Sequence, residues 1–455
     1  MNILASYAWL KEYVDLQEMP EQFAARVSLS GPGIERLYPQ GEELTGVVLG
    51  QILSVIPHPQ ADKLRLTTVD VGTKKPLSIV CGGSNLVEGQ WVAVATIGAN
   101  VKWHGEGGLI KLKPVAIRGE TSEGMICAAS EIGLFDAFPH GEREVMDLGW
   151  IQSSSKKPTF RPGTPLAAVL GLMDDTVMDI EVTTNRPDAV GMVGLAREAA
   201  AILKRPFLWK PSRLPSIARK KSGRVGLPVH VAEKKLCPRY LAALVEGVQV
   251  QPSPWWLKRR LLSAGIRPIN NIVDVTNYVM AELGQPMHAF DADKLMGGLH
   301  VRKAKAGETI AALDGKTYLL DDTMLVIADQ EHVVAVAGIM GGEATSVTSS
   351  TRSIVFECAT FDPVSIRRTA RQLNLYSDAQ LRFEKGLSTQ APPDALARGL
   401  EYGKELAGGS VTTLIDIRTG TYKPLVYKIT IDEIISLIGV SLTAREIIRT
   451  LRRLG

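Results

Sequence analysis

The chain has 455 residues, a formal net charge of +4, 45% hydrophobic residues and 22% charged residues, which is the composition of an ordinary globular protein. It is too long for one compact core, so we expect three or four domains. No apolar run approaches the roughly 20 residues that a membrane span requires. The early charges and Trp9 in the first segment exclude a secretory signal peptide.

The cysteines do not indicate a disulfide framework or a zinc site. None belongs to a CxxC pair, and the four lie far apart in the sequence, at Cys81, Cys127, Cys237 and Cys358. We therefore predict no metal site and a cytoplasmic location.

Positive charge is concentrated between Ala199 and Ala232, where no acidic residue occurs. Such a stretch could lie along phosphates. The alternative is a solvated basic linker, because Pro206, Pro211 and Pro215 interrupt it.

The first elements in chain order are two helices. Trp9, Leu10, Tyr13 and Val14 recur at helical spacing after a possible Ser6 cap, which predicts a short amphipathic helix over 6–16. A second helix is expected over 20–29. From about residue 44 the pattern changes to about five short β-rich runs separated by Pro, Gly and Asn, which predicts a small β-barrel.

A strand, a turn and a helix are expected over 176–204, and a new α+β region begins near residue 225. It is predicted to contain a helix over 254–264, mixed strands through residue 356 and a helix over 363–371. Thr443 and Glu446 form a capping box before a last helix. The chain stops after that helix, so we expect a fragment in which a further domain has only begun.

The β-rich region resembles the tRNA-binding oligonucleotide-fold (OB-fold) domain that several synthetase-associated proteins share. The resemblance rests on VVLGQILSVIPHPQADKLRLTTVDVG, IVCGGSN and KLKPVAIRGETSEGMICAASEIGL. An open barrel face suits base stacking, and its loops suit phosphates. The alternative is that these residues only shape turns and close the barrel. The candidate tRNA contacts that the resemblance implies are His58, Lys63, Arg65, Ser84, Asn85, Arg118 and Ser122.

Five further segments resemble, in the same order, the bacterial phenylalanyl-tRNA synthetase beta subunit: SYAWLKEYVDL, EVTTNRPDAVGMVGLAREAAAI, GIRPINNIVDVTNYVMAELGQPMHAFD, VAGIMGGEATSV and CATFDPVSIRRTARQLNLYSDAQLRFEKG. The resemblance implies a multidomain α+β protein. Its expected parts are a discontinuous N-terminal domain over 1–39 and 152–205, the barrel over 40–151, a basic linker over 206–224, an α+β editing module over 225–395, and the beginning of a winged-helix-like domain over 396–455.

The resemblance also implies an editing reaction. A hydrophobic pocket rejects an added hydroxyl by only about a hundredfold, so a phenylalanine pocket needs a second site that hydrolyses mischarged tyrosyl-tRNA(Phe). That site requires a buried polar partner for the phenol, because an unpaired partner penalises phenylalanine.

The positions that match the family's editing pocket fall in three segments. Glu357 is the expected acceptor for the tyrosine hydroxyl, and its alternative is a strand-end residue that faces solvent. His288, in a turn, is a candidate to orient the attacking water or the terminal ribose. Thr276 and Asn277 would position the amino group and the ester. The expected substrate-binding residues are Ala337, Gly338 and Ala359.

The synthetic centre is not expected in this chain. Arg382-Phe383-Glu384 matches the core of a class II ATP motif only superficially, because the expected third motif does not follow. ATP and Mg²⁺ would serve the holoenzyme outside residues 1–455, and the partners would be the alpha subunit, in an alpha2-beta2 heterotetramer, and tRNA(Phe). The alternative is a free-standing tRNA-binding or interaction protein without editing activity.

Overall fold

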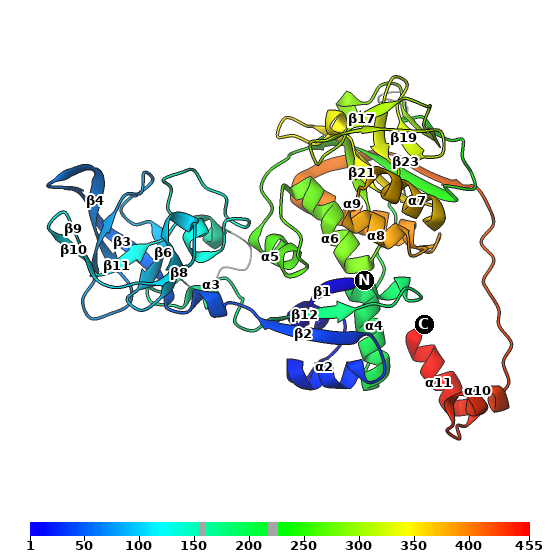
Figure 1. The fold of residues 1–455 in the computed structure, drawn as a ribbon, viewed down its shortest axis with the longest axis horizontal. Helices are drawn as coiled ribbons and strands as arrows, with labels where there is room; N and C mark the ends of the chain where they lie inside the picture. Colours follow the sequence, from blue (N-terminus) through cyan, green and yellow to red (C-terminus); the bar gives the residue numbers. More distant parts are fainter. Residues whose placement is uncertain (154–159, 217–225) are drawn as a thin grey trace.

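The computed structural model describes residues 1–153, 160–216 and 226–455 (Figure 1). The second half of the basic linker expected over 206–224 therefore lies outside the described residues. Within the described part, no helix is both long and apolar enough to cross a membrane.

A three-stranded antiparallel sheet joins distant parts of the chain near the N-terminus. Its order is β1 (Asn2–Ser6), β12 (Thr176–Glu181) and β2 (Gly33–Pro39). Helices α2 (Pro20–Ser28) and α4 (Met192–Leu203) accompany it (Figure 1). Because β12 follows the barrel in sequence, the barrel is inserted between two strands of this sheet.

The helix predicted over 6–16 is shorter than expected. Ser6 does cap it, since its Oγ accepts a hydrogen bond from the Trp9 N–H (3.0 Å), but α1 covers only Tyr7–Leu10. The segment then turns, and Val14 forms an isolated bridge with Phe207. The predicted apolar spacing is still used, because Trp9, Leu10, Tyr13 and Val14 are all buried.

The predicted barrel is present as a five-stranded sheet. Its strands follow the order β11 (Gly124–Ile126), β6 (Trp91–Thr96), β3 (Val47–His58), β4 (Ala61–Asp70) and β5 (Leu77–Cys81). The end strands β11 and β5 also contact each other, so the sheet nearly closes. Two small hairpins, β7 (Asn100–Lys102) with β8 (Leu109–Lys111) and β9 (Val115–Ile117) with β10 (Glu120–Ser122), extend it. Helix α3 (Leu166–Val169) follows.

Two sheets build the region after residue 226. One has the order β15 (His288–Asp291), β22 (Ser353–Thr360), β14 (Arg239–Val248) and β23 (Gly408–Arg418). The other has the order β13 (Val229–Val231), β16 (Leu299–Lys303), β19 (Leu325–Ala328), β20 (Val333–Val336) and β21 (Met340–Gly341). A hairpin of β17 (Thr309–Ala311) and β18 (Thr317–Leu319) lies beside them.

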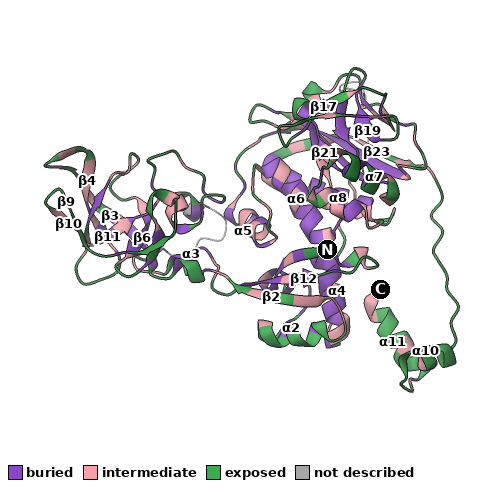
Figure 2. Cartoon of the chain, viewed as in Figure 1, coloured by how far each residue is buried: buried purple, intermediate pink, exposed green. Residues whose placement is uncertain are grey.

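Strands β15, β22 and β14 of the four-stranded sheet are mostly buried, whereas the edge strand β23 has no buried residue (Figure 2). Ile354, Phe356 and Cys358 of β22 join a core shared with helices α6 (Asn271–Leu283) and α9 (Ala391–Ala407). The alternating residues Val355 and Ala359 join a second core shared with the five-stranded sheet. Each strand of this sheet therefore presents one set of side chains to helices and the other set to a facing sheet.

The sequence analysis was wrong about residues 271–283, which were expected among mixed strands. They form α6, which begins after Asn270, whose side chain accepts from the N–H groups of Ile272 and Val273, and ends at Gly284 with φ 73°. The predicted helices over 254–264 and 363–371 are confirmed as α5 (Trp255–Ser263) and α7 (Pro363–Leu373).

The predicted boundary between 395 and 396 also needs correction. It falls within α9, and β23 pairs with β14 along almost its whole length. The structural unit that begins near residue 226 therefore extends through Arg418.

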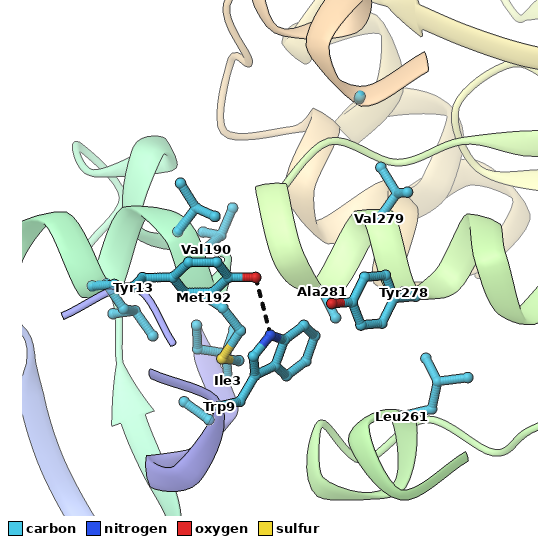
Figure 3. Close-up of a cluster of buried hydrophobic side chains, with 14 of the residues drawn as sticks. Ile3, Trp9, Tyr13, Val190, Met192, Leu261, Tyr278, Val279 and Ala281 are labelled. Carbon is cyan, nitrogen blue, oxygen red and sulfur yellow. Dashed lines mark hydrogen bonds between the residues drawn. The ribbon is translucent and has the colours of Figure 1, made fainter. Parts of the chain in front are cut away.

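Figure 3 shows how the N-terminal sheet is held against this unit. The indole of Trp9 stacks on the ring of Tyr278 from α6, with centroids 4.9 Å apart. Next to them, the Tyr13 hydroxyl donates to Oε1 of the fully buried Glu282 (2.5 Å), which also pairs with Arg398 of α9. The two parts thus share one hydrophobic core and one buried polar network.

The last residues extend away from the sheets (Figure 1). Helix α10 (Ile431–Ile438) and helix α11 (Ala444–Leu454) have no buried residues, although α11 contacts α4. The predicted capping box of Thr443 and Glu446 is confirmed at the start of α11.

Candidate functional site

Glu357 lies inside β22 and not at its end. It is 6% exposed, and its Cα partners are His288 on β15 and Ala242 on β14. The alternative of a solvent-facing, strand-end residue is therefore wrong. Burial raises the pKa of this carboxyl to about 8.

His288 opens strand β15, whereas the sequence suggested a turn. Its Nε2 is buried and has no hydrogen-bond partner among the described residues. Burial lowers the pKa of the imidazole to about 4, so the ring is neutral near pH 7. A Cβ on Gly341 would lie 2.4 Å from Cε1 of His288, so glycine at 341 is what leaves room for this ring.

The predicted positions Ala337, Gly338 and Ala359 lie on the same side of the four-stranded sheet as Glu357. Ala359 follows Glu357 by two residues on β22, and Ala337 belongs to the same inter-sheet core as Ala359. Gly338 has φ 68°, and a Cβ there would come within 2.7 Å of Phe361. The glycine is thus required by packing against that ring, whatever else it contacts.

Thr276 and Asn277 lie on α6, which packs against the other face of the sheet and contacts β15. The Thr276 hydroxyl donates to the Val273 carbonyl one turn earlier (2.7 Å). No hydrogen bond among the described residues joins either side chain to His288 or Glu357. The structure therefore brings His288, Glu357 and Ala359 together but leaves this pair on a neighbouring element.

Two buried polar side chains near Glu357 were not found from the sequence. Tyr240 on β14 is fully buried, and its hydroxyl has no partner within the described residues. Gln285 donates from Nε2 to the Ala359 carbonyl (2.9 Å), while its Oε1 is also buried without a partner there. Nothing in the sequence singled out Tyr240, because the register of β14 with β22 could not be read from one sequence.

Cysteine chemistry does not contribute to this site. Burial raises the pKa of Cys358 well above its ordinary value, and the Glu357 carboxyl raises it further. The thiol therefore stays protonated and is a poor nucleophile.

A cavity of about 1250 Å³ lies elsewhere, between α9, β14 and β23. Its lining includes Ile354 and Phe356, which point to the helical face of the sheet. It is therefore separate from the Glu357 face.

The candidate contacts on the barrel divide into two groups. Three are used by the barrel itself. The Ser122 hydroxyl accepts from the Val80 N–H (3.1 Å) and donates to the Gly124 carbonyl. Asn85 exchanges two hydrogen bonds with the backbone of Val145 (2.8 and 3.0 Å). His58 is 5% exposed, and its Nδ1 accepts from the Gln60 N–H.

The other group is accessible. Lys63, Ser84 and Arg118 are exposed, and Arg65 is half-buried. Arg143, which the sequence analysis did not single out, is exposed and donates to the carbonyls of Lys63 and Gly82 (3.1 and 2.7 Å). Arg143 thereby links the backbone of β4, on which Lys63 lies, to the segment that follows β5.

Arg382 was considered and rejected as part of an ATP motif. It lies in α8 (Asp378–Phe383), is 5% exposed and donates to the Asp378 carbonyl (2.9 Å). In the described part of the chain, no group of three His, Cys, Asp or Glu residues could hold a metal ion.

Comparison with known proteins assigns families to the barrel and to the region that contains Glu357. Residues 47–148 match a tRNA binding domain, and residues 236–408 match the B3/4 domain. The whole chain is also similar to curated phenylalanine–tRNA ligase beta subunits. It is 40% identical to that of Moorella thermoacetica over 98% of this chain, and 36% identical to that of Shouchella clausii over 99%. Over nearly its whole length the chain is therefore similar to phenylalanine–tRNA ligase beta subunits.

The beta-subunit resemblance stated for the sequence is thus confirmed. The chain spans 54–55% of the length of these relatives. Among solved structures, an N-terminal fragment of the phenylalanyl-tRNA synthetase beta subunit from Pyrococcus horikoshii is 18% identical, covering 62% of this chain and 77% of that chain, with a TM-score of 0.29. That similarity is too low to support an argument.

Proposed function

We propose that this chain binds tRNA(Phe) through its barrel and hydrolyses mischarged tyrosyl-tRNA(Phe) at the Glu357 face of its B3/4 region. The observation that carries the proposal is the placement of Glu357. A carboxyl that is 6% exposed, opposite the neutral His288 on the next strand, is a costly arrangement for a protein core. It is well suited to recognising a buried hydroxyl.

We assign the residues of this site the following roles. Glu357 accepts a hydrogen bond from the phenol of the substrate tyrosine. His288, with its unpartnered Nε2, hydrogen-bonds the attacking water or the terminal ribose and orients it. Ala359 and Ala337 would lie beside the aromatic ring of the substrate. Thr276 and Asn277 lie on the helical side of the sheet and would reach the ester only past the edge strand β15, which α6 contacts. Hydrolysis then proceeds through a positioned water, without a covalent enzyme intermediate.

The barrel supplies affinity for the nucleic acid. We assign it the OB fold because five antiparallel strands nearly close in the order β11-β6-β3-β4-β5. Lys63, Arg65, Ser84 and Arg118 are the contacts we retain, since their side chains are at least partly accessible. His58, Asn85 and Ser122 act by shaping the surface that carries them.

The proposed domain division follows the sheets. The N-terminal domain comprises 1–39 and 152–205, the barrel 40–151, the linker 206–224 and the editing module 225–418. Residues 419–455 begin a winged-helix-like domain. In the full-length protein the partner would be the alpha subunit in a cytoplasmic alpha2-beta2 heterotetramer. ATP and Mg²⁺ would act in its synthetic centre, outside these residues.

The test is deacylation of tyrosyl-tRNA(Phe) beside phenylalanyl-tRNA(Phe) by this chain and by its Glu357→Ala variant. Selective release of tyrosine that is lost in the variant would support the proposal. If release occurs only when the alpha subunit and the full-length beta subunit are present, presentation of the tRNA requires the holoenzyme. An unchanged tyrosine preference in Glu357→Ala would refute the role of Glu357.

A further inference from the structure

The feature that stands out beside Glu357 is the hydroxyl of Tyr240. The residue is fully buried, and its hydroxyl has no hydrogen-bond partner within the described residues. Tyr240 is the Cα partner of Ala359, while Ala242 is the partner of Glu357. Tyr240 and Glu357 are therefore diagonal neighbours on adjacent strands and leave the sheet on the same face, within reach of each other's side chains.

Packing alone does not explain this hydroxyl. The ring of Tyr240 belongs to the inter-sheet core with Phe290 and Val355, a place that phenylalanine would fill equally well. A buried hydroxyl without a partner is destabilising, because its hydrogen bonds to water are lost and not replaced. The hydroxyl is therefore explained best by a partner that is not part of the chain.

The electrostatic surroundings keep Tyr240 a hydrogen-bond donor. Burial raises the pKa of its hydroxyl well above the ordinary value, and the neighbouring Glu357 carboxyl and Cys237 thiol raise it further. The group is thus neutral at every physiological pH. Beside it, Glu357 offers an acceptor oxygen in either protonation state, since the protonated carboxyl keeps its carbonyl oxygen, so the two side chains can offer one donor and one acceptor.

A phenol is complementary to that pair, since its O–H donates one hydrogen bond while its oxygen accepts another. We propose that Tyr240 is a second specificity-determining residue of the editing site, which donates a hydrogen bond to the phenolic oxygen of the substrate tyrosine while Glu357 accepts one from its O–H. This inference rests on the proposed editing function. It adds that tyrosine is recognised at two points and that phenylalanine leaves both unpaired.

The exposure of the three side chains gives the direction of binding. His288 lies on the edge strand β15 and is partly exposed, Glu357 on β22 is 6% exposed, and Tyr240 on β14 is fully buried. Strands lie about 4.8 Å apart, so the path from β15 to β14 is roughly 10 Å. The ester is then held near His288 at the edge, and the phenol reaches the interior.

The experiment uses Tyr240→Phe, which removes the hydroxyl and keeps the ring. The probes are adenosines that carry tyrosine or phenylalanine in a non-hydrolysable amide at the 3′ position, titrated by calorimetry. We expect affinity for the tyrosyl probe to fall roughly tenfold and affinity for the phenylalanyl probe to stay the same. The selectivity of deacylation should narrow by a similar factor.

The control is Tyr7→Phe, which also removes a buried tyrosine hydroxyl but in the core around α2. It should leave both affinities unchanged. If the unmodified chain prefers the tyrosyl probe and Tyr240→Phe retains the full preference, the inference about Tyr240 is overturned while the editing function stands. If the unmodified chain shows no preference for either probe, with or without the alpha subunit, the proposed function fails, and with it this inference.

Discussion

His288 and Glu357 are paired across strands β15 and β22, and burial drives their pKa values in opposite directions. The imidazole falls to about 4 and the carboxyl rises to about 8. Near pH 7 the imidazole is therefore neutral and most of the carboxyl is protonated, so the two do not form an ion pair. Both groups are neutral because a charge on either one would have to be buried away from water.

The first prediction concerns Glu357 and pH. Its folded-state pKa lies above the ordinary value of 4.5, so between about pH 4.5 and pH 8 the folded chain keeps a proton that the unfolded chain releases. The free energy of unfolding should fall across this window by up to about 1.4 kcal/mol per pH unit. Glu357→Gln removes the effect, so its melting temperature relative to the parent chain should rise from pH 5 to pH 9. Parallel melting curves at all pH values would contradict the assigned burial.

His288 predicts the opposite dependence. Its folded-state pKa is about 4, below the ordinary 6.5, so the unfolded chain gains a proton between those values that the folded chain refuses. Its contribution to stability is therefore lost as pH falls from 6.5 to 4. His288→Asn should lose less stability than the parent chain over that range, measured by urea unfolding at pH 6.5, 5.5 and 4.5. The surface variant His332→Asn is the matched control, since that side chain is 74% exposed.

Gly341 tests whether the position of the imidazole matters. Alanine there would place a Cβ 2.4 Å from Cε1 and 2.8 Å from Nε2 of His288, so the ring must move. We expect deacylation of tyrosyl-tRNA(Phe) to fall at least tenfold, at a cost in stability of about 1–3 kcal/mol. At Gly420 an added Cβ meets nothing within 4 Å. Gly420→Ala should therefore leave the deacylation rate and the stability unchanged. Normal deacylation by Gly341→Ala would show that the ring orientation is dispensable.

The accessible and the internally bonded residues of the barrel should differ in their effects on tRNA binding. If Lys63 and Arg118 contact phosphates as proposed, Lys63→Ala and Arg118→Ala should each weaken tRNA binding and lower the slope of log K against log salt by roughly one. Asn85→Ala breaks both hydrogen bonds to Val145, so it should cost about 1–3 kcal/mol of stability with an unchanged salt slope. If Asn85→Ala instead lowered the slope of log K against log salt, Asn85 would be a tRNA contact.

The sequence was informative where a signal is local. The capping box of Thr443 and the five β-rich runs of the barrel needed only neighbouring residues. Helix α6 was missed because Ile272, Val273, Val275 and Thr276 resemble strand residues, although Asn270 and Gly284 marked both its ends. Tertiary packing, not propensity, makes that segment helical.

The candidate site shows a different limit. Glu357 and His288 could be singled out only through the family resemblance, and their pairing depends on a register between strands far apart in the chain. Tyr240 carried no signal, because β14 had to be aligned with β22 before its face was known. The functional proposal rests on the buried Glu357 carboxyl. That carboxyl is buried because two sheets pack face to face.

The last prediction concerns Glu282, through which the N-terminal sheet and the B3/4 region are joined. Its fully buried carboxylate accepts two hydrogen bonds from Arg398 of α9 (2.8 and 2.9 Å) and one from Tyr13. Glu282→Gln keeps the shape but removes the buried counter-charge of Arg398 and leaves only the exposed Glu401 as its ionic partner, so we expect a loss of about 3 kcal/mol in unfolding free energy. Asp314→Asn, at an exposed pair with Lys316, should change it by less than about 1 kcal/mol. Because Trp9 and Tyr278 still share a core, the melting transition should shift downward as one step (Figure 3). Two separate transitions in calorimetry would show instead that Glu282 alone couples the two parts.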